Sequence, residues 1–249
     1  MTNRNPSYLP GLLSGDDMIL SQEQALARKS ASPGPFEELF FANTGRLANK
    51  WIHYLPFYDS ILAPYRGKPI RMLEIGVFQG GSLDLWRSYF GPDAVLYGID
   101  IDPACAARRT PPNEVRIGSQ ADPKFLKAVV VEMGGVDIVL DDGSHVAAHQ
   151  RTSFGVLWPL LNVGGLYIIE DLHSSYWPKW GGGLRRPGSG VELVKSLIDD
   201  MHAWFHDEDE SYADRRQLGA ITIGNSIAAI QKIDDRLAPG HYRTGVLAD

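Results

Sequence analysis

The chain has 249 residues, 44% of them hydrophobic, and a formal net charge of −6 at pH 7. This length and composition suit one sizeable domain, and the acidic balance without any basic run argues against a nucleic-acid partner. The single cysteine excludes an internal disulfide, and no apolar run approaches the roughly 20 residues that a membrane helix needs, so we expect a cytoplasmic protein with no membrane partner.

The first 35 residues are rich in proline, glycine and serine, which predicts an N-terminal arm rather than a domain. The single domain that we expect covers residues 36–249. Apolar residues at helical spacing over 36–66 predict a helical lead-in of two helices. The pattern then alternates between short apolar runs and amphipathic stretches, which places the core of the domain at 70–235.

The alternating pattern predicts both the strands and the helices of this core. Short apolar runs predict five strands, at 70–78, 94–101, 114–119, 136–142 and 164–171. Helical patterns lie between and after them, at 82–90, 122–133, 149–161 and 191–205. The runs "LGAITIG" and "IAAIQKI" flank Asn225-Ser226 and predict a hairpin. The α/β fold expected is Rossmann-like, with a mainly parallel seven-stranded sheet and a C-terminal antiparallel hairpin.

The first strand ends in a glycine-rich loop, "LEIGVFQGGSLDLW", which carries Glu74, Gly76, Gly80 and Ser82. Glycines at such a turn let a backbone approach closely, although a plain tight turn would look the same. The spacing departs from G-x-G-x-x-G, and an acid at Glu74 is unfavourable beside a pyrophosphate. A ligand with a cationic portion and no phosphate, such as S-adenosylmethionine, fits this loop better.

Further polar residues follow the second, third and fourth strands. Asp100 ends the second strand and is placed to accept hydrogen bonds from ribose hydroxyls. Ser119 and Gln120 follow the third strand and could face an adenine. Asp141, the first of two acids that end the fourth strand, could face the cofactor or support the turn.

Three carboxylates and a histidine lie at the ends of the fourth and fifth strands. Asp142, Glu170 and Asp171 end strands that should be neighbours, and three bare carboxylates repel one another unless a cation joins them. A hard divalent ion with oxygen ligands, magnesium most simply, would join them. His145, three residues beyond Asp142, suits a general base. The alternatives are a helix cap for the aspartates and ordinary surface roles for His145 and His149.

Four segments taken together resemble the metal-dependent sugar O-methyltransferases of antibiotic biosynthesis. They are "LEIGVFQGGSLDLW", "YGIDID", "DDGSH" and "YIIEDLHSSYW". The mycinamicin and tylosin deoxysugar methyltransferases and those of enediyne rhamnose units belong to this family, and cephalosporin-pathway methyltransferases are relatives. The resemblance covers residues 36 to 235.

The resemblance implies a class I S-adenosylmethionine-dependent methyltransferase fold. It implies Mg²⁺ held by Asp142, Glu170 and Asp171, with His145 as the base that deprotonates a hydroxyl of a rhamnose-like deoxysugar on a natural product. It also implies a homo-oligomer. In the family an acid commonly precedes the Lys-Trp pair, whereas here Ala48-Asn49 precede Lys50-Trp51.

Aromatic residues after the fifth strand are candidate substrate contacts. Tyr176, Trp177 and Trp180 offer flat faces to a sugar or an aromatic aglycone, and packing under a loop would use them equally well. We add His149 to the candidate substrate contacts. Three other functions stay open at this point: a nicotinamide-dependent oxidoreductase, a hydroxylase-type tailoring enzyme, and a non-catalytic sugar- or cofactor-binding module.

Overall fold

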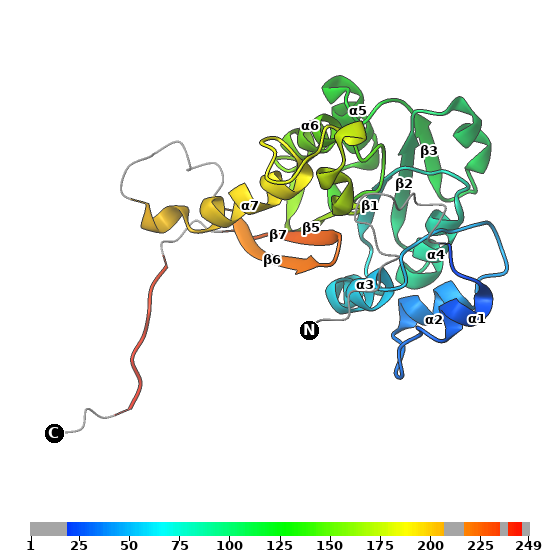
Figure 1. Cartoon of the computed structure of the whole chain (residues 1–249), viewed down its shortest axis with the longest axis horizontal. Helices are drawn as coiled ribbons and strands as arrows, with labels where there is room; N and C mark the ends of the chain where they lie inside the picture. Colours follow the sequence, from blue (N-terminus) through cyan, green and yellow to red (C-terminus); the bar gives the residue numbers. More distant parts are fainter. Residues whose placement is uncertain (1–18, 207–216, 235–238, 246–249) are drawn as a thin grey trace, which may run out of the picture.

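A computed structural model describes residues 19–206, 217–234 and 239–245 of the chain (Figure 1). Most of the predicted N-terminal arm, residues 1–18, therefore lies outside the described residues. Within the described part, no helix is long and apolar enough to cross a membrane.

A seven-stranded sheet forms the centre of the molecule, in the order β3-β2-β1-β4-β5-β7-β6. The first five strands are parallel, and β7 lies antiparallel between β5 and β6, so the predicted sheet and its C-terminal hairpin are confirmed. The bounds are β1 Arg71–Ile75, β2 Val95–Asp100, β3 Glu114–Ile117, β4 Val136–Asp141, β5 Leu161–Ile169, β6 Leu218–Gly224 and β7 Ile227–Lys232.

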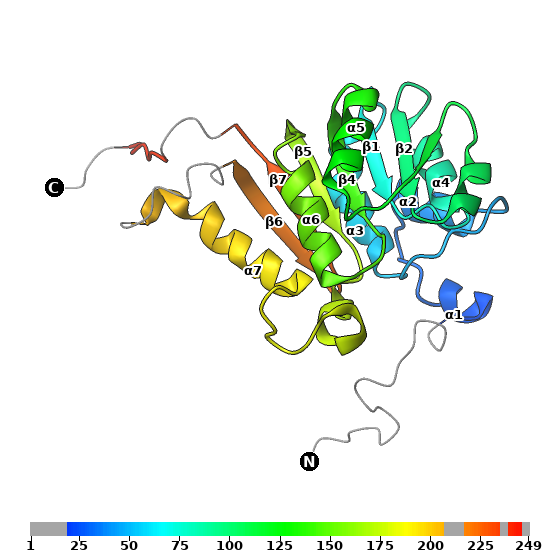
Figure 2. The ribbon, with the colours of Figure 1, turned by 90° about the horizontal axis from the view of Figure 1, so that it is seen from above.

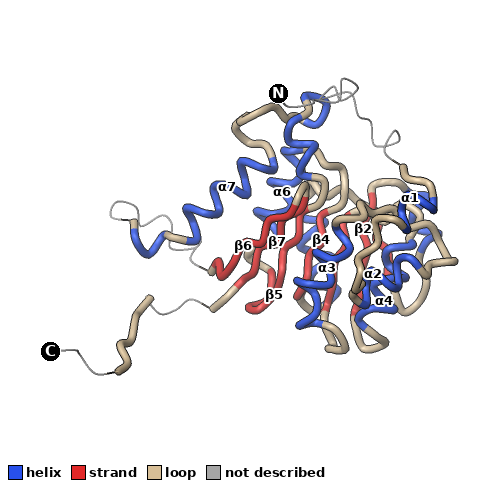
Figure 3. Tube along the Cα trace, turned by 60° about the horizontal axis from the view of Figure 1, so that its bottom comes forward, coloured by secondary structure: helices blue, strands red, loops and turns tan. Residues whose placement is uncertain are grey.

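Helices cover both faces of the sheet (Figure 2), and each face has its own apolar core. One face packs against α5 Pro123–Met133, α6 Ala147–Leu157 and α7 Gly190–Met201. The other face packs against α2 Pro35–Phe41, α3 Tyr54–Leu62 and α4 Gly81–Phe90, which Figure 3 shows on the near side of the strands. A short helix, α1 Gln22–Leu26, precedes them.

The structure moves the boundary between α6 and β5. The helix predicted to reach residue 161 ends at Leu157, and the strand predicted to begin at 164 begins at Leu161. Pro159 lacks an amide hydrogen and cannot continue the helix. Leu161 instead pairs with Val136 at the start of β4. The apolar run that we predicted to be a single helix is therefore divided between α6 and β5.

The lead-in, residues 36–66, packs directly on the sheet. The Phe36 ring stacks on Trp86 of α4 at 4.2 Å and meets Tyr58 of α3 edge-on at 5.2 Å. Asp59 of α3 caps α2 by accepting hydrogen bonds from the amides of Phe36 and Glu37. This packing brings the segment between α2 and α3 to the carboxyl edge of the sheet.

Candidate active site

The carboxyl ends of the parallel strands gather the predicted acids along one edge of the sheet. The pairing of Ile75 with Asp141, and of Asp141 with Ile169, brings the ends of β1, β4 and β5 level with one another. The polar residues expected at a ligand-binding edge are therefore close in space, as the topology predicted. They form two groups with different partners.

The glycines of the loop after β1 make room for the protein's own backbone. Gly76 has φ +98°, and a Cβ there would lie 2.2 Å from the carbonyl oxygen of Asp142. A Cβ on Gly81 would lie 2.3 Å from the carbonyl oxygen of Leu47 in the lead-in. At Gly80, with φ +79°, the nearest atoms belong to Arg46 and Arg108. The close approaches that these glycines allow within the described residues are between loops, and the close approach of this backbone to a ligand stays a prediction.

Glu74 and Ser82 bond to each other at the base of this loop. The Glu74 carboxylate is fully buried and accepts hydrogen bonds from Ser82 Oγ at 2.9 Å and from Trp86 Nε1 at 3.2 Å. Burial raises the pKa of Glu74 to about 7, although the Lys50 ammonium opposes the shift. Within the described residues the positive charge that acts on Glu74 is that of Lys50 in the lead-in, and the cationic ligand portion stays a prediction.

Asp100 organises the glycine loop from the end of β2. One carboxylate oxygen accepts the amides of Val77 and Phe78 at 2.9 and 3.1 Å, and the other accepts the amide of Asp102 at 2.9 Å. Burial alone would raise the pKa of Asp100, but these backbone bonds lower it. Asp100 is half-exposed, so its oxygens stay accessible at the predicted ribose position. Ser119, also half-exposed, accepts the amide of Ala121.

Asp141 and Gln120 form a buried, hydrogen-bonded pair. Asp141 is fully buried and accepts hydrogen bonds from Gln120 Nε2, from Ser153 Oγ at 2.5 Å, and from Tyr167 Oη at 3.3 Å. The Gln120 side-chain oxygen accepts the amide of Ser144 at 2.7 Å. Of the two roles open for Asp141, support of the turn is therefore favoured. Gln120 is buried and bonded to Asp141 and Ser144, and its place beside an adenine stays a prediction.

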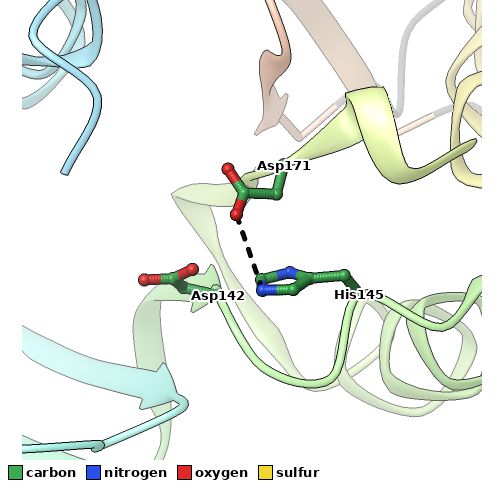
Figure 4. Close-up of side chains that lie close together, drawn as sticks. All are labelled: Asp142, His145 and Asp171. Carbon is green, nitrogen blue, oxygen red and sulfur yellow. Dashed lines mark ion pairs between the residues drawn. The ribbon is translucent and has the colours of Figure 1, made fainter. Parts of the chain in front are cut away.

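Asp142, His145 and Asp171 converge at the ends of β4 and β5 (Figure 4). One ligand atom from each lies within 4.8 Å of the others. His145 Nε2 lies 3.5 Å from Asp171 Oδ2. The Nδ1 atom of His145 is buried and has no hydrogen-bond partner within the described ranges, so Nε2 is the nitrogen that faces the carboxylates.

Glu170 is buried next to this group and contacts the lead-in. Its Oε1 accepts hydrogen bonds from Lys50 Nζ at 2.7 Å and from Tyr58 Oη. The same ammonium lies 2.5 Å from Asp142 Oδ2. Lys50 therefore joins two of the three carboxylates that were predicted to bind a metal.

Negative charge exceeds positive charge in this group. Burial raises the pKa of Glu170 well above its usual range, and the neighbouring Asp142 raises it further. Burial also raises the pKa of Asp142, against the opposing effect of Lys50. Burial alone would lower the pKa of Lys50, but Asp142 and Glu170 hold it well above its ordinary value. Because one ammonium cannot balance three ionised carboxylates, a divalent cation would complete the charge balance of this group. Carboxylate oxygens are the ligands that Mg²⁺ prefers.

Backbone strain is concentrated around the same edge. His145 and Asp171 both adopt left-handed backbone, with φ +57° and +53°, as do Phe78 of the glycine loop and Ser226 of the hairpin. Such conformations cost of order 1–3 kcal/mol each for residues with a Cβ and cluster at functional sites. Because the strain falls on the histidine and on a converging aspartate, it supports a functional role for this edge.

Four residues of the lead-in belong to this site and were not predicted as functional. Lys50 and Tyr58 contact Glu170, while Trp51 Nε1 and Tyr54 Oη lie 3.0 and 2.9 Å from Asp171 Oδ1. The available signal was a lysine directly before Trp51, in a segment otherwise suited to burial. Pairing it with acids about 100 residues away required the tertiary structure.

The candidate substrate residues lie beside the site, on its outer side. The side chain of Tyr176 is half exposed, and Trp177 packs edge-on to His173 at 4.8 Å and against Trp180 at 5.3 Å. His149 Nδ1 is bonded to Ser144 Oγ at 2.8 Å. A cavity of about 570 Å³ opens between residues 146–152 and 181–188, next in the chain to His145 and Trp180.

The sequence and the structure are both similar to known methyltransferases. A family described as "Methyltransferase domain" matches residues 73–172. The 8-demethyl-8-(2-methoxy-alpha-L-rhamnosyl)-tetracenomycin-C 3'-O-methyltransferase of Streptomyces olivaceus is 40% identical over 71% of this chain and 48% of its own length. The chain belongs to this family of antibiotic-pathway sugar O-methyltransferases. The resemblance found in the sequence is thereby confirmed.

Two further members extend the match over nearly the whole chain. The demethylmacrocin O-methyltransferase of Streptomyces fradiae is 36% identical over 92% of this chain and 63% of its own length. The MycE methyltransferase of the mycinamycin pathway, solved in complex with Mg, SAH and mycinamycin VI, superposes with a TM-score of 0.71 at 31% identity, over 94% of this chain and 67% of its own. The chain thus spans less than two thirds of the length of the curated relatives above. Membership of this family weighs against the oxidoreductase, hydroxylase and non-catalytic alternatives.

Proposed function

We propose that the protein is an S-adenosylmethionine-dependent, Mg²⁺-dependent O-methyltransferase that methylates a hydroxyl of a rhamnose-like deoxysugar on a natural product. The observation that carries the proposal is the convergence of Asp142, His145 and Asp171 beside the glycine loop of a class I methyltransferase fold. The backbone contact between Gly76 and Asp142 places the loop and this group side by side.

Mg²⁺ fits the donors of this edge. We assign Asp142, Glu170 and Asp171 as its ligands, because each of them has a carboxylate oxygen outside the hydrogen bonds between described residues. Bound there, the ion would supply Lewis-acid polarisation of the acceptor hydroxyl. The cofactor would lie along Gly76, Gly80, Ser82, Asp100 and Ser119, with Asp100 on the ribose.

His145 is the proposed base. Its Nε2 faces the carboxylates and accepts the proton of the acceptor hydroxyl, while Asp171 Oδ2, 3.5 Å away, stabilises the imidazolium that forms. The acceptor oxygen then bonds to the methyl carbon as the carbon–sulfur bond breaks, which leaves S-adenosylhomocysteine. Much of the rate would come from holding the two reactants in line.

The acceptor is proposed to lie between His145 and the aromatic side chains of residues 176–180. Trp177 packs on His173 and Trp180 next to this group, and the open 570 Å³ pocket that begins at Val146, the residue after His145, is lined also by Arg151 and Arg186. The name of the first relative above gives a rhamnosyl-tetracenomycin as its acceptor, which supports a rhamnosylated acceptor for this chain. The predicted homo-oligomer stays a prediction.

The proposal is tested by calorimetric titration of the protein with S-adenosylhomocysteine and with NADH, each with and without Mg²⁺. We expect S-adenosylhomocysteine to bind and NADH not to bind. A rhamnosylated polyketide incubated with S-adenosylmethionine and Mg²⁺ should then gain one methyl group, detected by mass. Binding of NADH alone would overturn the proposed class.

A further inference from the structure

A single short segment of the lead-in supplies the hydrogen-bond donors for all three proposed metal ligands. Lys50 Nζ lies 2.5 Å from Asp142 Oδ2 and 2.7 Å from Glu170 Oε1, and Tyr58 Oη donates to the same Glu170 oxygen. The Lys50, Glu170 and Tyr58 side chains are all buried. These bonds are therefore part of the packed interior and not of a solvated surface.

Asp171 receives its donors from the residues between Lys50 and Tyr58. Trp51 Nε1, which can only donate, lies 3.0 Å from Asp171 Oδ1. Tyr54 Oη lies 2.9 Å from the same oxygen and 2.9 Å from the carbonyl of Ser226, and it accepts the Asp171 amide at 3.2 Å. The side chain and the strained backbone of Asp171 are thus held by the same phenol.

The three carboxylates share one pattern. In each of them the lead-in holds one oxygen, and the other oxygen accepts no hydrogen bond from any residue within the described ranges. The held oxygens are Oδ2 of Asp142, Oε1 of Glu170 and Oδ1 of Asp171. The second oxygen of Asp171 is the one that faces His145. Because a carboxylate group is planar and rigid, a hydrogen bond to one oxygen restricts the directions in which the other oxygen can point.

We propose that residues 50–58 are a positioning segment that fixes one oxygen of each of these carboxylates and so presents the other oxygen to the metal ion. The inference rests on the proposed function and adds the residues that set the metal geometry. Groups that bond to metal ligands from behind typically change metal affinity by about 10–100-fold when they are removed. Lys50, Trp51, Tyr54 and Tyr58 are thus positioning residues, and none of them is assigned as a ligand.

The residues just before the positioning segment contact the glycine loop and the start of α4. The backbone carbonyls of Arg46 and Leu47 lie against Gly81 at the start of α4, and the Arg46 guanidinium is bonded to Asp84 at 2.6 Å. The chain from Arg46 to Tyr58 therefore runs from the glycine loop to the metal ligands. This continuity explains why a stretch outside the strand-and-loop core bears on the site.

The test removes single donors without removing a buried charge. Trp51→Phe deletes the indole donor to Asp171. Tyr54→Phe deletes a hydroxyl that lies between Asp171 Oδ1 and the Ser226 carbonyl and accepts the Asp171 amide. Tyr65→Phe is the matched control, since its hydroxyl donates to the Gly164 carbonyl, away from the acids. Affinity is measured with Mn²⁺ by electron paramagnetic resonance, and S-adenosylhomocysteine affinity by calorimetry on the same samples. We expect the Mn²⁺ dissociation constant to rise about tenfold or more in the first two variants.

In the same experiment the control should stay within about twofold of the wild type, and S-adenosylhomocysteine binding should be unchanged in all three variants. Equal Mn²⁺ affinity in Tyr54→Phe, Trp51→Phe and Tyr65→Phe would overturn the positioning role and leave the proposed function standing. Failure of the wild type to bind Mn²⁺ would instead overturn the metal dependence, and the positioning role with it. Lys50→Met is avoided as the first variant because it removes the ammonium from Asp142 and from the buried Glu170, which endangers folding.

Discussion

The two halves of the carboxyl edge treat their acids differently. On the cofactor half, the acids are Glu74, Asp100 and Asp141. They accept hydrogen bonds from within the strand-and-helix core, such as those from Ser82, Ser153 and the amides of the glycine loop. On the metal half, the donors to the acids come from the lead-in, and one ammonium serves two carboxylates. The acids of the cofactor half have hydrogen-bond partners within the core, whereas the metal half has three carboxylates for one ammonium.

This difference shows that an acid at a strand end does not by itself identify a ligand. Asp141 and Asp142 are consecutive residues, yet one is fully buried in a hydrogen-bond network and the other faces His145 and Asp171. What separates them is that Asp141 is the last residue of β4, with its side chain in the interior, whereas Asp142 begins the loop that follows the strand. The predictions below test this contrast.

The largest effect should come from the metal half. We expect His145→Ala to lower the methyl-transfer rate by about 10²–10⁴-fold, because the hydroxyl then lacks a base, and to leave S-adenosylhomocysteine affinity nearly unchanged. Asp142→Ala should abolish transfer. Both are measured by S-adenosylhomocysteine formation with a glycosylated acceptor. Turnover at the wild-type rate in either variant would refute the assigned role.

Replacing Asp141, the acid next to Asp142, should lower stability and leave metal affinity unchanged. Asp141→Ala strands the donors of Gln120, Ser153 and Tyr167 in the interior, so the free energy of unfolding should fall by about 3 kcal/mol. Its Mn²⁺ affinity, measured at a temperature where it is folded, should stay near that of the wild type. A selective loss of Mn²⁺ binding with unchanged stability would show that Asp141 belongs to the metal half.

A smaller effect should follow from the contact between the two halves. Gly76→Ala should lower the free energy of unfolding by about 2 kcal/mol or more, because φ is +98° and a Cβ would lie 2.2 Å from the Asp142 carbonyl oxygen. Gly67→Ala is the control, since Gly67 has φ +70° and nothing within 4 Å of the added carbon. Chemical denaturation measures both. Equal losses would mean that only backbone strain acts at Gly76.

The smallest effect should lie at the opposite edge of the sheet, where an acid has ordinary ion-pair partners. Hydrogen bonds from Arg109, and then from Arg116, lower the pKa of Glu114 to about 2. Its folded pKa is depressed, so its contribution to stability is present above the unfolded value of 4.5 and is lost as the pH falls toward 2.

Glu114→Gln should therefore cost less than about 1 kcal/mol at pH 7, as surface ion pairs do, and nothing near pH 2. Denaturation at a series of pH values measures the difference. A cost that does not change between pH 7 and pH 2 would show that the carboxylate charge is not responsible.

The sequence by itself determined the order of strands and helices, the parallel sheet with its hairpin, and the family. These features depend on local periodicity and on contiguous motifs, which can be read along the chain. It also identified Asp142, His145 and Asp171 as a group, because parallel strands end at a common edge. Only the tertiary structure decided that Asp141 and Gln120 are buried partners, that the glycines clear space for other loops, and that Lys50 reaches Asp142 and Glu170. Those facts depend on which side chains meet across 21 to 120 residues of chain. This is set by how neighbouring strands and the lead-in pack together and not by any local pattern.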